Sequence, residues 1–253
     1  MNEISQLSVK NNLLAVMSEG DFALLQPSLN PAVLNLGDIL IEQQGSLTEV
    51  FFVESGLVSV VSPDEADQSV ELGIYGFEGM GSTASVMTID RCPHQHIVQV
   101  EGRALRLDSG RLKRAQQSSE SLNSLMLKFA HIFGIQMAST AVANGAYSVA
   151  QRLARWLLMC QDRNDHTAVY MTHHFLSTML ATSRPSVTEA INNLESLGLV
   201  KSVRGKITIL DRKKLKEEAG RSYGRPEEEY RRLIGPPNIF ENSNSHWSRE
   251  IAQ

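Results

Sequence analysis

The stretch that decides the fold runs from Phe175 to Leu199 and reads FLSTMLATSRPSVTEAINNLESLGL. Its apolar residues recur at helical spacing in two groups, one on each side of Ala181–Pro185. Ser183 fits a helix N-cap, Pro185 is tolerated in a first helical turn, and Gly198 fits a C-cap. Two short helices joined by a tight turn are typical of a helix-turn-helix. The apolar groups are Leu176 and Leu180, then Val187, Ile191 and Leu194.

The segments around this motif predict a small winged domain. A helix that begins near Val149 opens it. Leu199–Val203 and Ile207–Leu210 are short apolar runs on either side of Arg204-Gly205-Lys206, which predicts a two-stranded hairpin, the wing. The rest reads as a charged helix at residues 211–220, a short helix at Pro226–Ile234 and a loose tail at Pro236–Gln253.

The first half of the chain has a different pattern. Residues 1–30 read as a short helical lead-in, and short apolar runs separated by glycines follow. Such runs predict a β-sandwich or jelly roll between Val33 and Leu107, so we expect an α+β fold for the chain. The runs are VLNL, ILIE, VFFV, LVSVV, VELGI, HIVQV and ALRL, with turns at Gly37-Asp38, Gly45, Gly56, Pro63-Asp64, Gly76–Gly81 and Gly102.

A long helix is predicted between the two halves, up to about Gly145. Its apolar residues recur at alternating spacings of four and three, which suits an exposed helix that pairs with a copy of itself. The alternative is a helix packed on its own sandwich. The predicted dimer seam is Leu122, Met126, Phe129, Phe133, Met137 and Thr140.

Composition and charge narrow the function classes. The chain has 253 residues and a formal net charge of −4. Residues 1–145 carry 8 Lys and Arg against 16 Asp and Glu, whereas residues 146–220 carry 11 against 7. The basic excess lies on the helix-turn-helix segment, which predicts a polyanionic partner.

We expect a cytoplasmic protein. No apolar run approaches ~20 residues, which predicts no membrane span. The first twenty residues lack a basic stretch followed by an apolar one, so no secretory signal is predicted. Cys92 and Cys160 are too few for a disulfide framework or a four-thiolate iron–sulfur cluster.

Two longer motifs resemble one known family. LGDILIEQQGSLTEVFFVESGLVSV (Leu36–Val60) is similar to the sandwich signature of the Crp/Fnr family of bacterial transcription regulators, and ATSRPSVTEAINNLESLGLVKSVRGKITI (Ala181–Ile209) to its helix-turn-helix and wing. The resemblance covers roughly residues 12–220. It implies a homodimer that binds a near-palindromic operator in double-stranded DNA, with RNA polymerase as a further partner.

The resemblance also implies the division of the chain into domains. These are a cyclic-nucleotide-binding-like sensor domain at residues 1–118, a dimerisation helix at 119–145, a winged helix-turn-helix at 146–220, and a C-terminal helix and tail at 221–253.

The resemblance assigns the side chains that read DNA. Arg184 stands where the family carries an arginine that contacts a base or phosphate, and its guanidinium suits guanine O6 and N7. Pro185 and Glu189 replace a glutamate and an arginine of the cAMP-responsive members, so the operator sequence stays open. Wing cations are expected to contact phosphates, the alternative for each being an ordinary surface charge. The expected DNA-binding residues are Ser183, Arg184, Ser186, Thr188, Glu189, Asn192, Lys201, Arg204 and Lys206.

The sensor lacks the residues that cAMP-responsive members use. A cyclic nucleotide needs an arginine for its phosphate and a carboxylate for its ribose. His94 stands roughly at the place of the arginine, and Ser82 at the place of the carboxylate. Met137-Ala138 replace threonine and serine. We therefore do not expect cAMP as the ligand, although Gly79 and Gly81 could offer backbone N–H groups to an anion. The candidate pocket for an unknown effector is Gly79, Gly81, Ser82, Thr83, His94, Gln95 and Met137.

Two other function classes stay open. One is a module of the cyclic-nucleotide-binding type that regulates a protein partner. The other is a jelly-roll enzyme with His94, His96 and Glu78 around a metal. His94 and His96 share a strand face near Cys92, but structural zinc sites use four ligands and no matched second pair is present. No nucleophile–base constellation supports catalysis, so we expect no enzyme, no metal and no other cofactor.

Overall fold

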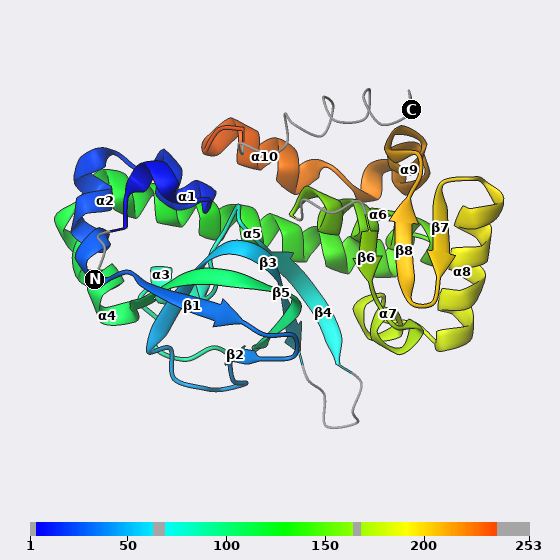
Figure 1. Cartoon of the computed structure of the whole chain (residues 1–253), viewed down its shortest axis with the longest axis horizontal. Helices are drawn as coiled ribbons and strands as arrows, with labels where there is room; N and C mark the ends of the chain where they lie inside the picture. Colours follow the sequence, from blue (N-terminus) through cyan, green and yellow to red (C-terminus); the bar gives the residue numbers. More distant parts are fainter. Residues whose placement is uncertain (1–3, 63–68, 164–167, 237–253) are drawn as a thin grey trace.

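The structure is a computed structural model that describes residues 4–62, 69–163 and 168–236. The turn predicted at Pro63-Asp64 and the predicted tail from residue 237 onward lie outside the described residues. A β-rich domain comes first, then a long helix, α5 (Glu120–Ala146), and then a mainly helical domain. Helix α5 runs along the long axis of the molecule, with the sheet on one side and the N-terminal and C-terminal helices on the other (Figure 1).

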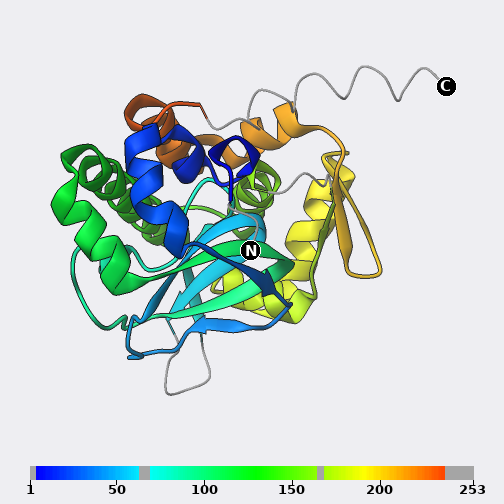
Figure 2. The ribbon, with the colours of Figure 1, turned by 60° about the vertical axis from the view of Figure 1, so that its left-hand side comes forward.

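The predicted helical lead-in consists of two capped helices. The Asn11 side chain caps α1 (Asn12–Val16), and the Ser18 side chain caps α2 (Glu19–Leu25), each by accepting a backbone N–H of the first turn. In Figure 2 these helices lie beside the C-terminal helix α10 (Arg225–Leu233). The two ends of the described chain therefore meet on one side of α5.

The sandwich has fewer and longer strands than the sequence predicts. Its sheet has the order β1-β5-β3-β4 with β2 paired to β5, and all pairs are antiparallel. The runs VFFV and LVSVV belong to one 14-residue strand, and HIVQV and ALRL belong to another. The strands are β1 (Asn30–Leu34), β2 (Ile39–Ile41), β3 (Glu49–Ser62), β4 (Val70–Tyr75) and β5 (Gln95–Asp108).

The turns predicted at Gly56 and Gly102 are bends inside these two long strands. Register shifts interrupt the β3–β5 ladder around Ser55 and Leu57. Gly56 has φ +93, and a Cβ at Gly102 would lie 2.0 Å from the carbonyl oxygen of Ser55. Glycine is required there because two backbones approach closely at a bulge, which lets each strand curl without ending.

The residues of the predicted dimer seam on α5 pack against this chain's own sandwich, which agrees with the alternative prediction. Helix α4 (Ser109–Ser118) leads into α5, whose apolar stripe packs on its own sandwich. An apolar pattern of this spacing marks a buried face but does not say which chain covers it. Leu122, Met126, Phe129, Phe133 and Thr140 are buried within the chain, and Met137 is half-buried.

Among the described residues, α5 is also long and apolar enough to cross a membrane, which the run lengths did not predict. Core helices pass the same test of length and composition. Because only 33% of its most apolar window is buried inside the chain, α5 keeps a large apolar surface.

The C-terminal domain has the predicted winged helix-turn-helix and one strand that was not predicted. That strand, β6, pairs with β8 to make a three-stranded sheet in the order β6-β8-β7. The elements are α6 (Val149–Asp162), β6 (Ala168–Tyr170), α7 (His173–Met179), α8 (Arg184–Ser196), β7 (Val200–Val203), β8 (Lys206–Ile209), α9 (Arg212–Ala219), the 3-10 turn η3 (Gly220–Ser222) and α10.

One hydrophobic core crosses from the sandwich into this domain. Leu57 and Ile74 of the sandwich belong to the same buried cluster as Trp156 and the apolar side chains of α7 and α8. At its centre the Trp156 indole N–H donates to Glu71 at 2.9 Å, and the Ser59 hydroxyl donates to the other Glu71 oxygen at 2.6 Å. Burial raises the pKa of Glu71 to about 7, despite both hydrogen bonds.

Glu71 makes folding depend on pH. The pKa of Glu71 is raised from 4.5 in the unfolded chain to about 7 in the folded chain. Its contribution to the free energy of unfolding is therefore fully present below pH 4.5 and is lost as the pH rises through 7. Glu71→Gln should remove this component, which is on the order of 3 kcal/mol. Urea unfolding at several pH values from 5 to 8 measures it. Glu49→Gln, at a half-exposed carboxylate, should follow the wild-type profile, and a parallel profile for Glu71→Gln would contradict the assignment.

Candidate nucleic-acid interface

The predicted helix-turn-helix is present, with its polar side chains outside. Val187, Ile191 and Leu194 of α8 are buried on one stripe, as predicted. Thr172 caps α7, and the turn into α8 passes through Ala181 at φ +46. The buried stripe fixes the rotation of α8 about its axis, so its opposite face is held toward solvent.

The N-terminus of α8 is capped as predicted. The Ser183 hydroxyl accepts the Ser186 N–H at 3.3 Å and pairs with the Ser186 hydroxyl at 2.9 Å. Arg184 and Pro185 are the first two helical residues, and both are exposed. A capped N-terminus with an exposed guanidinium presents positive charge and donors to an anion or a base edge.

The remaining polar residues continue this face along the helix. Thr188, Glu189 and Asn192 are exposed. The Thr188 hydroxyl donates to the Arg184 carbonyl oxygen at 3.2 Å and lies 3.0 Å from Nδ1 of His173. His173 joins this surface from α7 and was not among the predicted residues. In the sequence, the one indication that His173 is exposed beside α8 is that it follows Thr172, the N-cap of α7.

The wing is a tight hairpin. Val203 pairs with Lys206, and the intervening Arg204 and Gly205 have φ +49 and +77, as a two-residue turn of type I′ requires. Lys201 and Arg204 are exposed, and Lys206 is half-buried. The Ser202 N–H donates to Glu195 of α8 at 2.7 Å and fixes the hairpin to the helix.

Part of the basic excess of residues 146–220 lies inside the molecule. Arg155 and Arg163 are only 5% exposed. Arg163 forms an ion pair with Glu78 of the sandwich at 2.6 Å, and Arg212 forms one with Asp162. These cations bind the domain together and cannot reach a polyanion. The cations left on the surface are therefore fewer than the sequence count implies.

The glycines of the candidate effector pocket do not offer their N–H groups to a ligand. The Gly79 N–H donates to Gly76 at 3.0 Å, and the Gly81 N–H donates to Phe51 at 2.9 Å. A Cβ on Gly79 would lie 2.4 Å from the Phe129 ring, so α5 packs directly on this turn. The prediction of an anion site at these amides is wrong because the turn and the sheet already use both donors.

The other candidate positions lie on different elements: Ser82 and Thr83 at α3 (Thr83–Val86), His94 and Gln95 at the start of β5, and Met137 on α5. Ser82 is buried, and its hydroxyl lies 2.5 Å from that of Ser85 within the short helix α3. His94 is half-buried, its Nδ1 has no hydrogen-bond partner among the described residues, and burial lowers its pKa. Gln95 pairs with Glu42 at 3.3 Å, and Thr83 and Met137 are half-buried.

The histidine pair does not assemble a metal site. His96 is buried, with Nδ1 3.1 Å from the Tyr75 hydroxyl and Nε2 3.7 Å from the Cys92 sulfur. Burial lowers the pKa of His96 to about 3, so the ring is neutral. Glu78 is bonded to Arg163 instead. Within the described residues no three His, Cys, Asp or Glu side chains are grouped for a metal ion.

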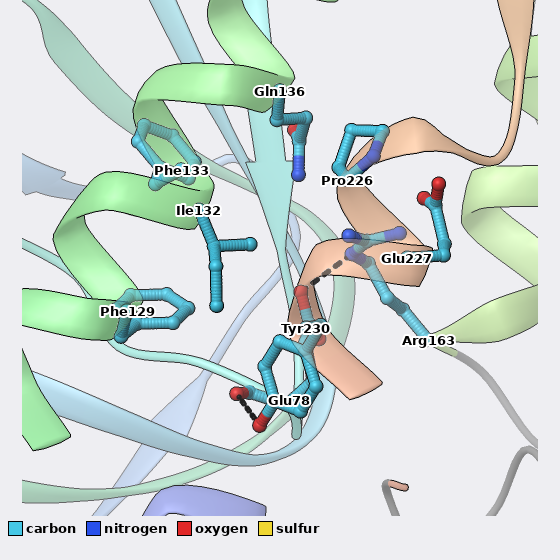
Figure 3. A pocket seen from close by; sticks show the side chains of 9 residues that line it. All are labelled: Glu78, Phe129, Ile132, Phe133, Gln136, Arg163, Pro226, Glu227 and Tyr230. Carbon is cyan, nitrogen blue, oxygen red and sulfur yellow. Dashed lines mark hydrogen bonds and ion pairs between the residues drawn. The ribbon is translucent and has the colours of Figure 1, made fainter. Parts of the chain in front are cut away.

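A small cavity lies between the sandwich, α5, α6 and α10 (Figure 3). Its volume of about 20 Å³ has room for one water molecule. Phe129, Ile132 and Phe133 form its apolar side, and Arg163 and Glu227 form its charged side. Glu78, Gln136, Pro226 and Tyr230 complete the lining.

Comparison with known proteins assigns the C-terminal part of the chain. Residues 151–218 match the Crp-like helix-turn-helix domain family. No curated protein matches the sequence.

Solved structures match over most of the chain. A transcriptional regulator assigned to the Crp/Fnr family from Eubacterium rectale is 18% identical, with a TM-score of 0.65, and the match covers 82% of this chain and 97% of that one. FixK2 from Bradyrhizobium japonicum is 12% identical, with a TM-score of 0.66 and coverages of 76% and 98%. The c-di-GMP-responsive regulator CLP from Xanthomonas campestris is 14% identical, with a TM-score of 0.62 and coverages of 77% and 100%.

These matches agree with the geometry of both halves. They cover 76% or more of this chain and 97% or more of the matched ones, so they span the β-rich domain, the long helix and the winged helix-turn-helix together. The chain therefore has the fold of the Crp/Fnr transcription regulators and carries a Crp-like helix-turn-helix domain at residues 151–218.

Proposed function

We propose that this chain is a sequence-specific DNA-binding transcription regulator that works as a homodimer in the cytoplasm and is not an enzyme. The observation that carries the proposal is the exposed, rigidly capped face of α8, which runs from Ser183 to Asn192 and sits beside a wing with exposed cations. A recognition helix of this kind enters the major groove by its N-terminus. RNA polymerase is the further partner that control of transcription requires.

We propose the side chains predicted from the sequence as the ones that bind DNA. Arg184 reads a base, and the other residues lie around it on α8: Ser183, Thr188, Glu189 and Asn192 are exposed, and Ser186 is half-buried. Lys201, Arg204 and Lys206 of the wing position the domain on phosphates.

The sensor is proposed to respond to something other than cAMP, and without a bound metal. The Gly79 and Gly81 amides are used within the fold, and the Phe129 ring fills the space against Gly79. An effector that binds here has to move α5 away from this turn.

The dimer is proposed to form on the exposed face of α5, opposite the predicted seam. Leu127 is 44% exposed and Val142 is 59% exposed. An apolar surface of this size on a long helix calls for a partner that covers it. Six exposed residues alternate at spacings of four and three, and the small ones let two helices approach closely. They are Leu127, His131, Gly134, Ala138, Ala141 and Gly145, and the exposed Val142 lies beside them.

Arg184→Ala should abolish discrimination between the cognate operator and an unrelated duplex. The loss should be ~10- to 100-fold, because one bidentate contact to guanine is worth ~1–3 kcal/mol. Fluorescence anisotropy on both duplexes measures it, with the operator taken from genome-wide mapping of bound DNA. Arg111→Ala removes an exposed arginine of the sensor domain and should bind as wild type does. Isotherms for Arg184→Ala that coincide with wild type on the operator would exclude Arg184 as the reading residue.

Wing cations should affect affinity without affecting sequence preference. Lys201→Ala and Arg204→Ala should each weaken binding to all duplexes alike. Each should reduce the slope of log K against log salt by about 1, because one fewer counterion is released. Titrations between 50 and 200 mM salt give the slope. An unchanged slope in both variants would mean that the wing does not contact phosphates.

A charge on the exposed α5 face should separate the dimer. Ala138→Glu places two carboxylates at the proposed helix crossing and should shift the protein to monomer in sedimentation at micromolar concentration. Val33→Glu adds the same charge at an apolar residue of β1 that is 70% exposed, and it should leave the dimer intact. A dimer that survives Ala138→Glu would place the interface elsewhere.

A further inference from the structure

The C-terminal helix α10 lies outside the matched domain and connects all parts of the molecule. The family match ends at residue 218. The chain then turns through η3 and Gly224, at φ +111, and runs back along α5 toward the N-terminal helices. There α10 packs along α5 and beside α1 (Figures 1 and 2). The helix therefore joins the DNA-binding domain back to the sensor.

Tyr230 fastens α10. It is 3% exposed, and its ring belongs to the core cluster of α1, α2 and α5. Its hydroxyl donates to the Glu78 carbonyl oxygen at 2.7 Å and accepts from the Asn12 side-chain amide at 2.9 Å. The Glu78 carboxylate also accepts a hydrogen bond from Arg163, so this one residue bonds both to α10 and to the end of α6.

Glu227 opposes this attachment. It is 4% exposed, and neither carboxylate oxygen has a hydrogen-bond partner among the described residues. Figure 3 shows the side chain beside Arg163 at the cavity, yet the two form no ion pair. A buried carboxylate without partners destabilises the arrangement that buries it. The other titratable groups near it are Glu78, Arg155, Asp162 and Tyr223, of which Tyr223 is a neutral phenol.

The arginines near Glu227 are bonded to other groups, Arg155 to the Thr140 hydroxyl at 3.1 Å. In this network, as far as the structure describes it, three guanidinium groups (Arg155, Arg163 and Arg212) face four carboxyl groups (Glu71, Glu78, Asp162 and Glu227). Glu78 and Asp162 are paired with arginines, and Glu71 is hydrogen-bonded. Glu227 is the carboxyl group left over.

We propose that α10 is a strap, a helix that docks reversibly on α1 and α5. Tyr230 stabilises the docked position, and the buried, unpaired carboxyl group of Glu227 destabilises it. Undocking of α10 frees the DNA-binding domain from the sensor. The docking of α10 does not depend on the proposed function. Only its effect on DNA binding rests on that function. Burial raises the pKa of Glu227, so the docked strap takes up a proton. Docking is strongest at low pH and weakens as the pH rises.

Hydrogen exchange of the full-length protein tests the strap. Glu227→Gln should slow exchange of the α10 amides ~10-fold, because a neutral side chain is buried at lower cost. Tyr230→Phe keeps the ring and loses both hydrogen bonds, so exchange should quicken ~10-fold. Glu228→Gln is the matched control, since Glu228 is exposed in the same first helical turn and should change exchange less than ~2-fold. The slowing of wild-type exchange between pH 8 and 5, corrected for intrinsic rates, should be absent from Glu227→Gln.

A second readout reports whether the strap holds the domain. The chain has two tryptophans, so Trp247→Phe leaves Trp156 as the single indole at the interface. Iodide quenching of Trp156 should rise in Tyr230→Phe and fall in Glu227→Gln. The proposal is overturned if Glu227→Gln exchanges as Glu228→Gln does, if wild-type α10 exchanges only with the β3 core, or if Trp156 quenching ignores both variants. None of these readouts involves DNA, so a failure of DNA binding would reject the proposed function separately.

Discussion

The arrangement of the two halves depends on one buried carboxylate. Glu71 accepts from Ser59 within the sandwich and from Trp156 of the DNA-binding domain, in the middle of a core that both halves share. Rotation of the DNA-binding domain would remove the indole donor and open the core at the same time. A buried carboxylate that loses a donor without gaining water is costly. The interface is therefore expected to be either docked or undocked, because packed interfaces change between discrete states and not by gradual sliding.

The same constraint explains how the basic residues are used. A count over residues 146–220 assigns all of their cations to a polyanion, but Arg163 is buried in an ion pair with Glu78 and Arg155 is buried against the Thr140 hydroxyl. The exposed cations lie at the start of α8, on the wing and on α9, where Lys213, Lys214 and Lys216 are exposed. Arg163, by contrast, serves the contact with the sensor through Glu78. Charge sums along a sequence cannot make this separation, because they ignore burial.

Features that depend on neighbouring residues were predictable. The Ser183 cap, the Gly198 C-cap, the buried stripe of α8 and the hairpin at Arg204-Gly205 follow from residues within one turn of each other. Features that depend on distant backbone were not. Gly102 looks like a turn residue until the Ser55 carbonyl is placed against it, and the Gly79 and Gly81 amides look available until their acceptors are known. The spacing identified the face of α5 that meets the sandwich, but it did not show which chain covers that face, because the helix also carries apolar residues on its exposed side.

Helix α5 has apolar residues on two faces, one packed on the sandwich and one exposed. Phe129 packs one face against the Gly79 turn, and the opposite face carries the exposed residues proposed above as the dimer surface. Glu78, the residue before that turn, holds α6 through its carboxylate and α10 through its carbonyl oxygen. A ligand that displaced this turn would therefore disturb the packing of α5, the ion pair with the DNA-binding domain and the seat of the strap together. Because these contacts meet at one turn, a shift of the turn acts on α5 and on the DNA-binding domain at once. No separate chain of contacts between the two is needed.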